Sequence, residues 1–154
     1  MSHDFYWHQI IIDDPACLPG KIIYDVIQVL LCKIEFKYVV LDDIEGAAQK
    51  GLIPILRGME NSVLELDEFM SIVREVQQFD FGDFFLFKEY PKKWSNGTSY
   101  PHAIAQTDTT VRAIDDQYVY IYTPYQEIVD VITSTEYKIE SIKTDTLEKL
   151  EYPG

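Results

Sequence analysis

Basic residues are scarce in this sequence. Thirteen lysines and arginines stand against 26 aspartates and glutamates, which gives a formal net charge of −13. The excess is evenly spread, with 6 basic against 13 acidic residues up to position 77 and 7 against 13 after it. A field of this sign repels phosphate backbones and attracts basic protein surfaces, so we do not expect direct binding to nucleic acid.

Cysteines and long apolar runs are also few. Cys17 and Cys32 are the only cysteines among the 154 residues, and their spacing predicts neither a disulfide framework nor a metal cluster. No apolar run approaches the roughly 18 residues of a membrane span. The first residues lack the basic and apolar regions of a signal peptide. We therefore expect one soluble, cytoplasmic domain over residues 1–154, with no membrane partner.

The motifs that mark common enzyme classes are missing as well. None of the seven glycines forms a P-loop or a G-x-G-x-x-G fingerprint. The nucleophile elbow G-x-S-x-G and the spacings of zinc and EF-hand sites are absent too. The sequence predicts no catalytic residue, no metal and no organic cofactor, but it leaves open an enzyme with unmarked residues.

The apolar pattern predicts alternating strands and helices. We expect strands at residues 5–12, 36–41, 83–90, 107–114, 117–123 and 137–143, and helices at 21–35, 42–50, 67–78 and from 124 onward. Residues 52–56, around Pro54, indicate an edge strand or a covered loop. Residues 91–106 indicate a long loop. Asp67, Thr123 and Asp145 are expected to cap the helices that follow them.

These elements define an α+β class: a single domain whose mixed or antiparallel sheet carries helices packed on it. The clearest pair is the hairpin of 107–114 and 117–123, joined at Asp115-Asp116. Cys32 is expected to be buried as a small hydrophobe. Nine side chains are predicted to share one core: Val26, Leu30, Ile34, Val73, Val76, Val119, Ile121, Ile128 and Ile132.

Aromatic residues are the second unusual content, with 11 Tyr, 8 Phe and 2 Trp. In the strand at 117–123, three tyrosines share one face, while Val119 and Ile121 share the other. The tyrosine face either packs under a helix with its hydroxyls at the rim, or forms a binding platform, because tyrosine is enriched at interface hot spots.

Residues 105–123 (AQTDTTVRAIDDQYVYIYT), followed by Pro124-Tyr125, resemble segments of small acidic immunity proteins of bacterial polymorphic and contact-dependent toxin systems. The resemblance implies a non-catalytic cytoplasmic protein that binds one cognate toxin domain and blocks its active site or substrate groove. The charge agrees with this interpretation. Many such toxins are nucleases, whose phosphate-binding surfaces must be basic, and an acidic inhibitor is steered toward them.

Two surfaces are candidates for the toxin contact. The first joins aromatic anchors to an acidic border, although Lys92 and Lys93 would repel a basic toxin there: Trp94, Tyr100, His102, Asp115, Asp116, Tyr118, Tyr120 and Tyr122. The rival surface is purely acidic: Asp42, Asp43, Glu45, Glu65, Asp67 and Glu68. The alternative function is a small enzyme or ligand-binding domain that uses the loop at 91–106, with His102 and a nearby carboxylate as its polar centre.

Overall fold

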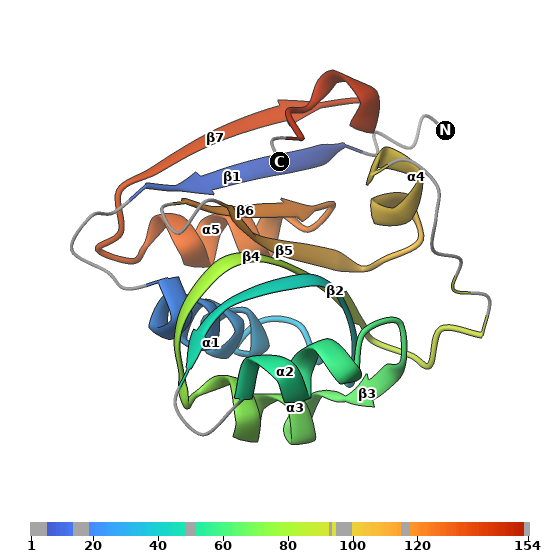
Figure 1. Ribbon diagram of the computed structural model, residues 1–154. Coiled ribbons are helices and arrows are strands. Elements are labelled where there is room, and N and C mark those ends of the chain that lie inside the picture. The colour runs from blue at the N-terminus through green and yellow to red at the C-terminus, as the bar shows by residue number, and fades with distance from the viewer. Residues whose placement is uncertain are drawn as a thin grey trace.

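The computed structural model describes residues 6–13, 19–48, 52–92, 94, 100–114 and 118–152. In chain order the elements are β1 (Trp7–Ile12), α1 (Pro19–Leu31), β2 (Tyr38–Ala48), α2 (Leu52–Gly58), β3 (Val63–Glu65), α3 (Leu66–Val73), β4 (Val76–Phe87), α4 (Tyr100–Ala105), β5 (Thr109–Ile114), β6 (Tyr118–Thr123), α5 (Gln126–Thr133), β7 (Ile139–Thr144) and the 3₁₀ helix η2 (Leu147–Lys149). The strands form one sheet in the order β3-β2-β4-β5-β6-β1-β7 (Figure 1). Every neighbouring pair is antiparallel, so the predicted α+β class is confirmed.

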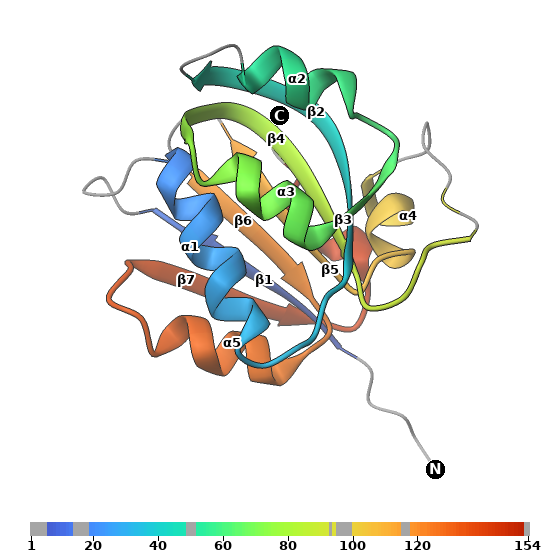
Figure 2. The ribbon, with the colours of Figure 1, turned by 90° about the horizontal axis from the view of Figure 1, so that it is seen from below.

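The main core lies between one face of the sheet and the helices α1, α2, α3 and α5 (Figure 2). Alternation along β6 sends Val119 and Ile121 to this face, where both are buried. Leu30 of α1 is fully buried at its centre. The predicted core is confirmed: eight of its nine members are buried in this cluster, and Ile34 packs against it partly buried.

The other face of the sheet is covered by α4, η2 and the segment that follows η2. Ile104 of α4 and Leu147 of η2 pack there with Tyr120 and Tyr122 of β6. Tyr122 is 0% exposed and Tyr120 is 8% exposed. Of the two interpretations of the tyrosine face, packing under a helix is therefore the correct one for these two rings.

Two predicted elements have the wrong type. Residues 42–50 were expected to be helical, but β2 continues to Ala48 and pairs with β4 through several register shifts. Asp43 has a φ of 52° at this bend, a conformation that Asp adopts more readily than most residues. Residues 52–56 belong to the helix α2 instead of a strand or loop. Pro54 fits because it lies in the first turn, where the backbone N–H needs no partner within the helix.

Other boundaries shift for local reasons. The helix expected at 67–78 ends at Val73, because β4 already begins at Val76. Part of the loop expected at 91–106 is the helix α4. The predicted caps Asp67 and Asp145 are wrong, because the N-caps of α3 and η2 are Glu65 and Thr146, without side-chain cap bonds. The helix α5 begins two residues later than expected, with Tyr125 as its N-cap, but Thr123 Oγ1 does accept from the backbone N–H of Tyr125, at 3.2 Å. Cys32 is exposed rather than buried, and Cys17 lies outside the described residues.

Candidate partner-binding surface

The structure distributes the first predicted surface over several environments. Asp115 and Asp116 lie outside the described residues. Tyr120 and Tyr122 belong to the packed layer described above, so they are part of the fold rather than exposed anchors. Tyr118 lies two residues before Tyr120 on the same strand. Its side chain is half-buried and remains accessible to solvent.

The loop members of that surface are also separated from each other. The ring of Trp94 packs against Phe85 and Phe87, at centroid distances of 4.8 and 5.8 Å. His102 is exposed on α4. Tyr100 turns inward, with its ring 4.0 Å from the guanidinium carbon of Arg112. The structure therefore does not bring these three side chains together into one exposed site.

Beneath Tyr100 lies a buried ion pair that the sequence analysis missed. Arg112 Nε donates to Asp83 Oδ1 at 2.7 Å, and both side chains are 2% exposed. The two residues face each other in register on β5 and β4. The available signal was the arginine itself, which stands between Val111 and Ala113 in a predicted strand. Its partner is 29 positions away along the chain.

Burial dominates the electrostatics of this layer. It raises the pKa of Asp83 to about 6, against the attraction of Arg112, while the nearby carboxylates of Asp42 and Asp43 add to the rise. Burial, together with the charge of Asp83, also raises the pKa of Tyr100 to about 12. Because the ion pair is closed off from solvent, we interpret it as structural rather than catalytic.

A groove crosses the covered face at the β7 side of the sheet. Its larger part, of about 460 Å³, is lined by Tyr118 and Tyr120 of β6, Ile11 of β1, Ile139 and Glu140 of β7, and by Asp13, Lys138 and Glu151. A smaller part of about 110 Å³ shares Ile11, Glu140 and Glu151 and extends to Gln9, Ser141 and Ile142. We call the two parts together the edge groove. It has three carboxylates and one lysine around an apolar and aromatic floor.

Strand register and the chain end build this groove. Ile11 lies opposite Tyr120 on one side and Glu140 on the other, so the three side chains form one row across β6, β1 and β7. The backbone N–H of Glu151 donates to Gln9 Oε1 at 2.7 Å, and its carbonyl accepts from the Tyr122 hydroxyl. These two bonds fix the segment after η2 as one wall of the groove.

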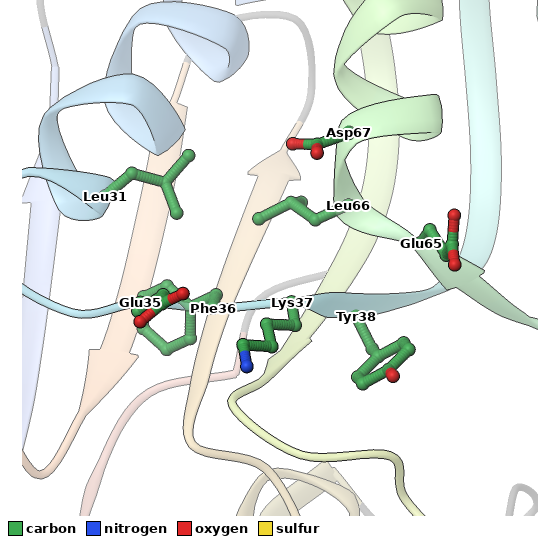
Figure 3. A pocket seen from close by; sticks show the side chains of 8 residues that line it. All are labelled: Leu31, Glu35, Phe36, Lys37, Tyr38, Glu65, Leu66 and Asp67. Atoms are coloured by element: carbon green, nitrogen blue, oxygen red, sulfur yellow. The ribbon is translucent and has the colours of Figure 1, made fainter.

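A second groove, the corner groove, lies where the end of α1 meets β2, β3 and the start of α3 (Figure 3). It has a volume of about 450 Å³. The carboxylates of Glu35, Glu65 and Asp67 surround Leu31 and Leu66 there, with Lys37 as the lining cation. The backbone N–H of Leu66 donates to the carbonyl of Lys37 at 2.9 Å and ties the start of α3 to the residue just before β2.

The corner groove contains only part of the predicted acidic surface. Glu65 and Asp67 line it, and Glu68 is exposed on the first turn of α3. Asp42, Asp43 and Glu45 lie instead at the bend of β2, where Asp42 faces Asp83 of β4. The six residues predicted as one surface are therefore two separate groups.

Charge alone does not distinguish the two grooves, because each has three carboxylates and one lysine. The outermost strand beside each groove does distinguish them. The corner groove borders β3, which has three residues, whereas the edge groove borders β7, which has six residues and carries Ile142, a side chain that is 48% exposed. An apolar side chain beside an acidic rim is typical of a protein contact. The edge groove is therefore our candidate binding surface.

The described residues contain no group of three or more His, Cys, Asp or Glu side chains arranged to hold a metal ion. His8 is buried, and burial lowers its pKa. A pocket of about 270 Å³ beside the predicted loop is lined by Phe87, Pro91, Trp94 and Gln106, without His102. Within the same described part of the chain, no helix has the length and apolarity to cross a membrane.

Comparisons with protein-family models, with curated proteins and with solved structures give no significant match to this chain. The fold and the surface therefore define the class: a strongly acidic α+β protein with a seven-stranded antiparallel sheet and an acidic, aromatic groove at one edge of it.

Proposed function

We propose that this chain is an immunity protein that binds and neutralises a cognate bacterial toxin domain with a basic surface, and that it has no catalytic activity of its own. The observation that carries the proposal is the edge groove, in which three carboxylates border tyrosine and isoleucine side chains. Such a groove suits the two parts of an arginine or lysine side chain, an apolar stem and a charged head.

The contact would work as follows. The stem of a toxin arginine lies over Ile11 and Tyr118, while its guanidinium is bound by Glu140 and Glu151. The net charge of −13 steers the basic domain toward the complex at long range. If the toxin is a nuclease, its phosphate-binding groove is the basic surface that this chain covers, so substrate and inhibitor exclude each other.

A genetic selection tests the function directly. Fragments of the source genome are expressed in a surrogate host with and without this chain. We expect at least one fragment that kills the host only when this chain is absent, and whose purified product forms a stoichiometric complex with it. If a library of full coverage holds no toxic fragment that this chain neutralises, the proposal is refuted.

Two matched charge reversals then test the surface. Glu140→Lys with Glu151→Lys changes the edge groove, and Glu65→Lys with Asp67→Lys makes the same change in net charge at the corner groove. We expect the first pair to slow association with the toxin more than the second does, because long-range steering changes equally in both and only the first pair also changes the groove itself. The reverse result would move the site to the corner groove.

Ligand binding beside Trp94 is the second candidate function. The indole Nε1 of Trp94 is buried and has no hydrogen-bond partner among the described residues, and the 270 Å³ pocket lies against the same ring. A screen of small hydrogen-bond acceptors by calorimetry tests it, with Trp94→Phe as the control, because this variant removes the indole N–H and keeps an aromatic ring. A hit that this variant abolishes would favour the ligand-binding function.

A further inference from the structure

We infer that the toxin contributes an extended segment that pairs with β7 as an eighth strand of the sheet. This inference rests on the proposed function and adds the kind of segment that the edge groove takes. Its starting point is the position of β7, which ends the strand order next to β1.

The outer edge of β7 is open to pairing. The strand pairs with β1 without a register shift from Trp7↔Thr144 to Ile12↔Ile139. No other strand of the described chain pairs with it, and residues 140–143 are all exposed. A strand edge of this kind presents unpaired backbone N–H and C=O groups that another chain can use.

Proteins usually protect such edges with proline, a bulge, a very short strand or a charge. The opposite edge follows this rule, because β3 has only three residues. In contrast, β7 has six residues, no proline and no bulge. The strand carries two charged side chains, Glu140 and Lys143, and the ammonium of Lys143 lies 4.3 Å from the centre of the Tyr6 ring. Six residues are enough to pair with a partner strand of ordinary length.

The side chains of β7 specify the chemistry of the added strand. Glu140 and Ile142 lie opposite Ile11 and Gln9, so both project on the side of the edge groove. An added strand places alternate residues on that side. Basic residues there meet Glu140 and Glu151, and an apolar residue covers Ile142. The segment therefore alternates on one face between basic and apolar residues.

Charge argues for a basic segment rather than a second copy of this chain. Two copies would each bring a net charge of −13 to the interface. Ile142 of both copies can meet across a two-fold axis, but the repulsion opposes this contact at ordinary ionic strength. A basic segment gains from the same field.

Hydrogen exchange and binding with a synthetic probe test the inference. The probe is a peptide as long as β7 in which arginine and valine share one face, and its control is the same peptide with the edge-facing backbone amides N-methylated. We expect the probe to protect backbone amides of β7, and methylation to weaken binding by about tenfold or more, because it removes the strand hydrogen bonds. Protection spread over other acidic surfaces would refute the inference.

Two isoleucine variants provide a matched control in the protein. Ile142→Lys places a charge at the edge of β7, whereas Ile55→Lys places the same charge on α2 at a side chain of equal exposure, 47% against 48%. We expect about tenfold weaker probe binding for the first and less than about twofold change for the second. Equal losses would show a bulk charge effect, and dimerisation of the free chain through β7 would assign the edge to a second copy. Both results overturn the inference.

The same variants separate this inference from the proposed function. If Ile142→Lys still neutralises the toxin as well as wild type does, the added strand is refuted and immunity stands. If the probe pairs with β7 but no toxin is neutralised, immunity is refuted, and β7 is assigned to a basic strand from a partner other than a toxin.

Discussion

Replacing Arg112 by methionine removes the guanidinium that faces Asp83 but keeps most of the apolar volume of the side chain. The Asp83 carboxylate then stays 2% exposed, without this counter-charge. Breaking a buried ion pair in this way costs about 3–5 kcal/mol. A typical domain has a free energy of unfolding of about 5–15 kcal/mol. We therefore expect the Arg112→Met variant to fold but to lose a large share of this free energy at neutral pH.

The pH dependence gives a sharper test than the loss itself. Burial raises the pKa of Asp83 from 3.8 to about 6, so the folded state binds this proton more tightly than the unfolded state does. Protonation of Asp83 therefore stabilises the folded state. This contribution is complete at a pH below the unfolded-state pKa of 3.8 and is lost as the pH rises through the folded-state pKa of about 6. Arg112 lowers the pKa of Asp83, so Arg112→Met should raise it further and move the loss to higher pH. We therefore expect the variant to lie closer to wild type at about pH 5 than at about pH 7.5.

Urea unfolding at both pH values measures the two effects. The control is Asp83→Leu with Arg112→Met, which removes both charges and should lie within about 1–2 kcal/mol of wild type, because paired charges can often be replaced by packed apolar groups. A loss below about 1 kcal/mol in the single variant would show that the pair is solvated. An equal loss at both pH values would refute the coupling to Asp83.

Four further outcomes are expected. Leu30→Ala should cost about 2–5 kcal/mol in urea unfolding, because Leu30 is fully buried; a loss below about 0.5 kcal/mol would place α1 at the periphery. Gly82→Ala should cost about 1–3 kcal/mol, because the new Cβ would lie 2.9 Å from Phe84 Cζ; unchanged thermal unfolding would show that the ring moves freely. Dialysed protein should contain no stoichiometric transition metal by elemental analysis, and a retained metal would contradict this. The charge reversal at Glu140 and Glu151 should slow toxin association in stopped-flow mixing while leaving circular dichroism unchanged, and unaltered kinetics would contradict the edge groove.

Local patterns predicted the parts of the fold that local physics decides. Alternation in β6 assigned Val119 and Ile121 to the core, and the apolar faces of α1 and α5 supplied Leu30 and Ile128. The bend of β2 was beyond such reasoning. Asp42 and Asp43 have the composition of a helix start, but pairing with β4 extends the strand through them. Long-range pairing overrides local propensity at such positions.

The candidate site was less predictable than the fold. Tyr118 was identified from its strand, but the groove also needs Glu140 and Glu151, which come from β7 and the chain end. Their convergence with Ile11 depends on strand order, which no local pattern in the sequence specifies. The acidic residues themselves could be read from the sequence. Their division between the corner groove and the bend of β2 could not be predicted without the register of the sheet.

The place of β1 in the sheet has a consequence for how the protein is made. The strand β1 lies between β6 and β7, so during synthesis it finds its two partners only after more than 100 further residues have been added. Pairings of such sequence separation form late and slowly. The edge groove, which needs β1, β6, β7 and Glu151 together, is therefore among the last features to assemble. A nascent chain that stops before β7 should carry the main core but no edge groove, which is complete only after synthesis has passed residue 151.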